Sequence, residues 1–231
     1  MNRLISLSKG TIHRRRLFQY AGTAMLAVAV AGCKENNPEP STPYINKDNT
    51  IDLKDDTGLL NYIYSLAQLE AAFYTKAVEN LGAGYTSTQT LFLNDIKWHK
   101  TAHREFFKTF LGPAAIGSLE FDFSAIDFSV PTAVFGLART FDNLGLAAYN
   151  GAIEKSKEAY TLIILSQIAS VQARHGAWIS TQLPDVIFGN LLELKELGSD
   201  ETKGLDVALP AAQVLAQATK YIKTQLNVIN L

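Results

Sequence analysis

The sequence predicts an all-α protein, an up-down bundle of four long helices with one extra helix near the C-terminus. Over four long stretches, apolar residues recur at spacings of three and four, the period of an amphipathic helix. Two connections between these stretches are short and one is long, which predicts a long crossover between the second and third helices. The expected elements are helices at 56–81 and 87–111, the crossover at 112–130, and helices at 131–158, 159–183 and 210–227.

Residues that cap or break helices lie at each expected boundary. Asp56 and Thr57 give an N-terminal cap signal for the first helix. Ser129 is expected to cap the third helix, whose first turn holds Pro131. The other boundaries are set by residues that end or open helices, namely Gly82, Gly84, Gly112, Pro113, Pro184 and Pro210.

Two segments depart from the helical pattern. Residues 119–124 alternate in polarity as a strand does, but no partner strand is expected, so the crossover is predicted to be irregular. Residues 184–208 are mixed in character, with one short helix expected around 188–196.

The first 32 residues have the features of an export signal. Five basic residues and no acidic residue accompany an apolar run over 21–31, which is shorter than a membrane span. Residues 14–18, Arg-Arg-Arg-Leu-Phe, resemble a twin-arginine export signal, with an ordinary secretory signal as the alternative. The run ends in Val-Ala-Gly before Cys33, which resembles the lipobox of bacterial lipoproteins. This resemblance implies that Cys33 becomes the first mature residue and carries a lipid.

The expected organisation is an export signal over 1–32, a polar linker over 33–55 and one helical domain over 56–231. Cys33 is the only cysteine, which excludes an intrachain disulfide bond. Removal of the signal leaves 16 basic and 22 acidic residues, a net charge of about −6, so no nucleic-acid partner is expected. We expect a protein of the cell envelope, anchored in a membrane through lipidated Cys33 and facing the periplasm or the outside.

Polar side chains interrupt the apolar stripe near the middle of each of the four main helices. A polar group on such a stripe costs free energy unless it finds a partner. A lone buried histidine is usually structural, but four helices that contribute at the same height indicate one common centre. The residues concerned are Glu70, His99, Lys100, His103, Asp142, Gln172 and His175, of which His99 is expected at the helix surface.

The segments around these positions resemble the ferritin-like superfamily, in particular bacterial ferritin-like proteins related to desiccation-induced proteins. The resemblance covers about residues 56–231 and implies a ferritin-like four-helix bundle. The stretches that carry it are 69–74 (LEAAFY), 99–107 (HKTAHREFF), 140–151 (TFDNLGLAAYNG) and 171–177 (VQARHGA).

In the ferritin-like pattern, the first and third helices each supply a glutamate, and the second and fourth each supply Glu-x-x-His, for two metal ions. Lys100 and Gln172 depart from this pattern, because they stand where the family has the glutamates that bridge the metals. The residues that agree with it are Glu70, His103 and His175, with Asp142 as a shortened match.

The two departures argue against a dinuclear centre. Four carboxylates would offset the charge of two divalent ions, whereas here two carboxylates face one ammonium group. We expect a metal-free centre in which Lys100 pairs with Glu70 or Asp142. One alternative stays open, a single iron or manganese ion with Lys100 turned away or neutral. Its ligands would be Glu70, His103, Asp142, His175 and, as a neutral oxygen donor, Gln172.

The sequence therefore leaves several functions open. The first is an envelope-anchored ferritin-like lipoprotein with a degenerate metal site and a non-catalytic, structural or stress-related role. The alternative is a mononuclear iron or manganese protein, either a binding protein or an oxidase-like enzyme. A third reading is a scaffold that binds partners through residues 184–208 and the acidic surface. No substrate is indicated, and the sequence leaves open whether bundles pair as homo-oligomers.

Overall fold

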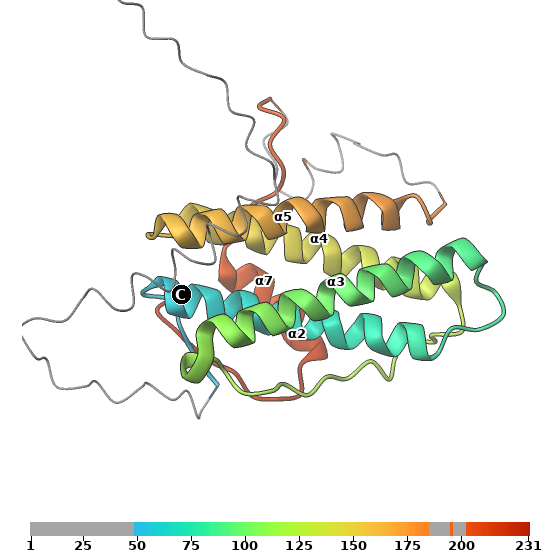
Figure 1. The fold of residues 1–231 in the computed structure, drawn as a ribbon, viewed down its shortest axis with the longest axis horizontal. Helices are drawn as coiled ribbons and strands as arrows, with labels where there is room; N and C mark the ends of the chain where they lie inside the picture. The colour runs from blue at the N-terminus through green and yellow to red at the C-terminus, as the bar shows by residue number, and fades with distance from the viewer. Residues whose placement is uncertain (1–48, 185–194, 196–201) are drawn as a thin grey trace, which may run out of the picture. The chain divides into compact units, whose positions relative to one another are not determined.

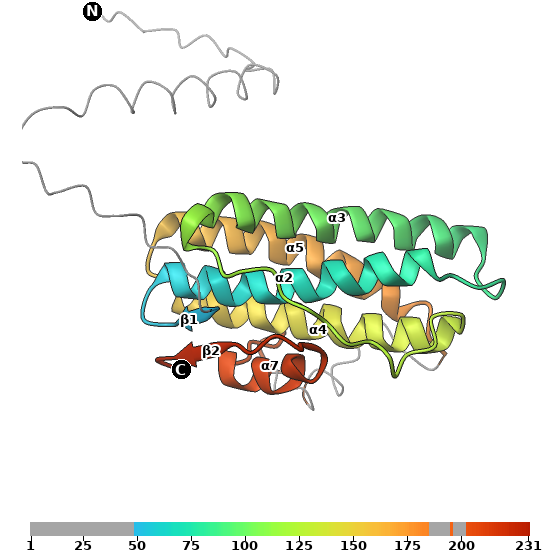
Figure 2. The same cartoon turned by 90° about the horizontal axis from the view of Figure 1, so that it is seen from below.

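The computed structural model describes residues 49–184, 195 and 202–231, and in these residues the predicted all-α bundle is confirmed. Four long helices lie side by side, with a short helix and a strand pair near the C-terminus (Figures 1 and 2). The export signal, Cys33 and most of the expected helix at 188–196 lie outside the described residues. The helices are α2 (Asp56–Glu79), α3 (Ser87–Leu111), α4 (Pro131–Lys155), α5 (Ala159–Ser180) and α7 (Ala211–Ala218).

The helix ends follow local capping chemistry and differ from expectation in places. The side chain of Asp55, one residue before the expected cap, accepts from the Gly58 amide at the start of α2. A capping box of Thr86 and Gln89 begins α3. The expected Ser129 cap on α4 is wrong, because Ser129 bonds to Asp127 instead and the N-cap position has no side-chain bond. Helices α4 and α5 end three residues earlier than expected.

The C-terminal segment is the largest departure from the predicted elements. The expected helix at 210–227 is helical only over α7 and a following 3₁₀ turn, Thr219–Tyr221. The chain then becomes extended, and β2 (Asn227–Ile229) pairs in parallel with β1 (Thr50–Asp52). Residues 119–124 also find a partner, because Phe121 forms an isolated antiparallel bridge with Ile222. These contacts join segments far apart in sequence, which local periodicity does not reveal.

The crossover runs along the length of the bundle, so neighbouring helices are antiparallel. Helix α4 begins where α2 ends, with Gly82 packed closely against Ser129 and Gly84 against Pro131. At the same end, Gln89 of α3 donates a hydrogen bond to Gln182, just after α5. Figure 2 shows the crossover passing over α2 from the end of α3 to the start of α4.

Two amide side chains of α2 hold the crossover against the bundle. Asn61 Nδ2 donates to the Ala114 carbonyl at 2.9 Å, and Asn61 Oδ1 accepts from the Ile116 amide at 2.7 Å. About two helical turns later, Gln68 bonds to the backbone of Gly117 and Leu119 in the same way. Because partners surround α2, its middle turns are buried on nearly every face.

The core of the bundle contains a cluster of aromatic side chains around Phe73. Phe73 of α2 makes edge contacts with Tyr74 and Phe141, and Phe123 and Phe128 of the crossover pack against it.

No helix in the described part of the chain is both long enough and apolar enough to cross a membrane.

Asn61→Ala should lower the free energy of unfolding by about 1–3 kcal/mol, because it leaves the buried Ile116 amide and the Ala114 carbonyl without partners. Urea unfolding measures this change. Asn94→Ala is the matched control, since Asn94 donates only to Thr90 within its own helix. Equal losses in the two variants would contradict the role given to Asn61.

Candidate functional site

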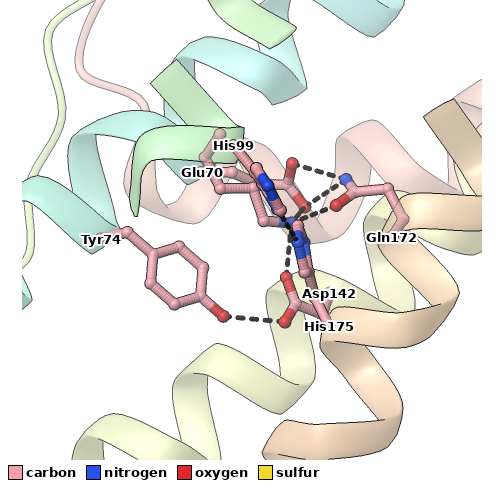
Figure 3. Close-up of polar contacts among 7 residues, drawn as sticks. Glu70, Tyr74, His99, Asp142, Gln172 and His175 are labelled. Carbon is pink, nitrogen blue, oxygen red and sulfur yellow. Dashed lines mark hydrogen bonds and ion pairs between the residues drawn. The ribbon is translucent and has the colours of Figure 1, made fainter. Parts of the chain in front are cut away.

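The polar residues of the four helices meet around the amine of Lys100, which is 0 % exposed. Lys100 Nζ lies 2.9 Å from Glu70 Oε1 and 2.6 Å from Asp142 Oδ1. It also donates a hydrogen bond to Gln172 Oε1. Figure 3 shows Glu70, Asp142 and Gln172 reaching this centre from separate helices. The amine thus satisfies its three donors with three side-chain oxygens.

The acceptor groups of the centre are in turn fixed by their neighbours. Gln172 Nε2 donates to both oxygens of Glu70, at 3.0 Å and 2.8 Å. Tyr74, one helical turn after Glu70 on α2, donates its hydroxyl to Asp142 Oδ2 at 2.7 Å (Figure 3). Every carboxylate oxygen therefore accepts at least one hydrogen bond, as expected of two ionised groups.

The buried charges set one another's protonation. Burial raises the pKa of Glu70, and the Lys100 ammonium offsets part of that effect. Burial alone would lower the pKa of Lys100, but the Asp142 and Glu70 carboxylates outweigh it and raise that pKa. Lys100 is therefore an ammonium group in this arrangement.

Gly145 of α4 makes room for the centre. A Cβ atom at this position would lie 2.5 Å from Glu70 Oε1 and 3.3 Å from Gln172 Nε2. A cavity of about 10 Å³ lies beside it, lined by Glu70, Gly145 and apolar side chains of α2 and α4. Only glycine allows the α4 backbone to approach the Glu70–Gln172 pair this closely.

The histidines lie next to the centre but do not bond to Lys100. His175 Nε2 and His99 Nδ1 are 2.8 Å apart, and the two rings stack with centroids 5.1 Å apart. His99 is exposed, as expected, yet it makes this contact with a buried residue. The Nδ1 atoms of His103 and His175 are buried without a hydrogen-bond partner.

Sequence reasoning found most of this cluster but missed two of its members. Tyr74 and Gly145 were not assigned to the centre, although both lie within it. The spacing of Tyr74, four residues after Glu70, was the available signal for Tyr74. For Gly145 no local signal existed, because its role depends on the approach of two other helices.

The arrangement does not fit the dinuclear site that the sequence resemblance implies. Lys100 Nζ lies between the two carboxylates, in contact with both. Within the described ranges, no group of three or more His, Cys, Asp or Glu side chains is placed to hold a metal ion.

Lys100→Met should lower the free energy of unfolding by about 3–5 kcal/mol, because it leaves two buried carboxylates without their cation. Chemical denaturation of the purified variant measures the loss. Lys108→Met is the matched control, since Lys108 is exposed on the same helix. A loss no larger than that of the control would show that the ion pairs contribute little.

Acid should destabilise the fold through His103, which is partly buried, and His175, which is buried. Burial lowers the pKa of His103 to about 4 and that of His175 to about 2. An unfolded histidine binds its proton near pH 6.5, so the unfolded chain gains protons first as the pH falls. Stability should therefore decrease below pH 6.5, by up to about 1.4 kcal/mol per pH unit for each histidine.

Urea unfolding between pH 7 and pH 4.5 checks this dependence. His103→Gln and His175→Gln should each have a flatter profile than the wild type over this range, because glutamine does not titrate. Profiles parallel to that of the wild type would contradict the neutral state of these histidines in the folded protein.

Comparison with known proteins agrees with the fold. A family model described as a ferritin-like domain matches residues 55–184, more than half of the chain. The match includes every residue of the centre around Lys100. A search of curated proteins gave no match. On the strength of the family match and the helical bundle, the chain belongs to the ferritin-like domain family.

Proposed function

We propose that the chain is a non-catalytic, envelope-anchored ferritin-like lipoprotein with a structural or stress-related role. Its bundle centre is a degenerate dimetal site in which an amine replaces the metals. The observation that carries the proposal is the contact of Lys100 Nζ with Glu70, Asp142 and Gln172.

The charges in the centre support a metal-free state. Two divalent ions need several carboxylates, and unit charges about 4 Å apart interact by about 4 kcal/mol even at an effective dielectric of 20. The ammonium of Lys100 would repel any cation placed beside it. Gln172 cannot replace the missing bridge, because its neutral amide is already bonded to Glu70.

A mononuclear iron or manganese protein is the second candidate. One observation favours it, the buried and unpartnered Nδ1 atoms of His103 and His175. Glu70 and Asp142 would complete the ligand set with Gln172 as a neutral donor, and Lys100 would have to leave the centre. The contacts of Lys100 favour the first candidate over this one.

Metal analysis of protein purified from periplasmic extract should find no stoichiometric iron or manganese in the wild type. Lys100→Glu combined with Gln172→Glu restores both bridging carboxylates and should gain two equivalents of iron. Lys108→Glu with Gln167→Glu is the control, since both positions are exposed on the same two helices. One equivalent of metal in the wild type, lost in His103→Ala and His175→Ala, would overturn the proposal in favour of the second candidate.

The lipoprotein part of the proposal rests on the sequence before the described domain. The order Val-Ala-Gly-Cys33 after an apolar run is that of a lipidation signal, and the arginines at 14–16 favour twin-arginine export. The polar segment that follows Cys33 would then tether the helical domain to a membrane of the envelope.

Labelled palmitate should attach to the wild-type protein and not to Cys33→Ala, because Cys33 is the only cysteine of the chain. After membrane fractionation, the wild-type protein should be found in the membrane pellet and the Cys33→Ala variant in the soluble fraction. Equal labelling of the two proteins would contradict lipidation at Cys33.

A further inference from the structure

An amine, an amide and a carboxyl group are in mutual contact at the bundle centre. Lys100 Nζ contacts Gln172 Oε1 and lies 2.9 Å from Glu70 Oε1. Gln172 Nε2 donates to the two oxygens of Glu70. One carboxyl group thus touches both a nucleophile and the nitrogen that would leave the amide. We propose that Lys100 and Gln172 form an intramolecular isopeptide bond, with Glu70 as the proton carrier.

The reacting atoms are close and shielded from water. A carbonyl bond is about 1.2 Å long, so a hydrogen bond to Gln172 Oε1 leaves Lys100 Nζ within about 4 Å of Gln172 Cδ. Lys100 and Gln172 are 0 % exposed and Glu70 is 2 % exposed. Three helices hold the groups in place, which supplies the proximity that an uncatalysed amide exchange lacks. Exclusion of water also protects the product from hydrolysis.

The reaction balances without any further reactant. Lys100 ammonium transfers one proton to Glu70, and the resulting amine attacks Gln172 Cδ. Glu70 delivers that proton to Gln172 Nε2, and the C–N bond to Nε2 breaks as the new C–N bond to Lys100 forms. The attacking nitrogen gives up a second proton to Glu70, which remains neutral. The products are one amide, one neutral carboxylic acid and one ammonia molecule, so atoms and charge are conserved.

The surroundings suit the product as well as the reactants. The cavity of about 10 Å³ beside Glu70 and Gly145 has room for about one molecule of the size of water or ammonia. The linked nitrogen keeps one hydrogen, which can donate to Asp142 Oδ1 in place of the ammonium. The ammonium and one carboxylate disappear together, so the net charge of the buried centre does not change.

Asp142 also lies close to the amine, at 2.6 Å, but it lacks a suitable proton donor. Its second oxygen accepts from Tyr74, a phenol whose pKa burial raises well above 10. Glu70, in contrast, is already bonded to the nitrogen that must leave Gln172. The two carboxylates favour the ammonium, so the reactive amine forms only transiently, and loss of ammonia drives the linkage forward.

The bond would tie α3 to α5 across 72 residues of chain. The ammonium form of Lys100 described above is the state before linkage. The linked centre keeps the same net charge, so a metal-free centre can exist with or without the link. A stoichiometric metal in the wild type would contradict the proposed function, whereas unlinked peptides would contradict the linkage alone.

Tryptic digestion and mass spectrometry of the full mature chain test the linkage. Trypsin cannot cleave after an acylated lysine, so Lys100 would stay within a peptide of residues 98–104. Gln172 lies in the peptide 158–174. We expect the wild type to give these two peptides as one species, lighter than their sum by one ammonia molecule. Separate peptides with cleavage after Lys100 would overturn the proposal.

Two variants assign the roles. Gln172→Met keeps the approximate shape of the side chain without its amide, and Glu70→Gln removes the proton carrier. Both variants should yield unlinked peptides. Circular dichroism should show that their helices are intact. The wild-type digest decides the question even if a variant fails to fold. A link to the Asp142 peptide with loss of water would overturn the assignment to Gln172. A complete link in Glu70→Gln would overturn the role of Glu70.

Discussion

Lys100 places an amine at the centre of the bundle, where no part of it is exposed to water. A buried ammonium is tolerated only when opposite charges and hydrogen-bond acceptors surround it. Glu70, Asp142 and Gln172 meet that requirement from three other helices. Their positions in turn require Tyr74 on Asp142 and a glycine at 145, where a side chain would collide with Glu70. The polar side chains that the four helices bring to this height are therefore arranged around one nitrogen atom.

We propose that the same amine prevents this bundle from binding the metal ions for which a ferritin-like fold is suited. A ferritin-like bundle can hold two metal ions when carboxylates from its helices bridge them. In the degenerate site that we propose, Lys100 in place of a carboxylate reverses one charge, and Gln172 in place of another removes one. The bundle would then keep a buried polar centre without the electrostatic conditions for two cations. The histidines at 103 and 175 stay beside this centre, neutral and without a bond to the amine.

The helical part of the fold could be predicted because its signals are local. Apolar spacing and capping residues located α3 to the residue and α2 within two residues. The polar positions at 70, 100, 142 and 172 could be grouped because each one interrupts an apolar stripe at the same height. The strand pair of Ile51 with Val228 and the bridge of Phe121 with Ile222 could not be predicted, because their partners lie far apart in sequence. The close approach at Gly145 was hidden for the same reason.

Unfolding free energies of matched variants test most directly whether the charges of this centre depend on one another. The single variant Lys100→Met leaves two buried carboxylates without a cation. Addition of Glu70→Gln and Asp142→Asn removes both charges while the side-chain shapes are kept. Because the cost lies in the unpaired charges, the triple variant should regain at least half of the stability that the single variant loses. A triple variant that loses the sum of the three single losses would contradict the account.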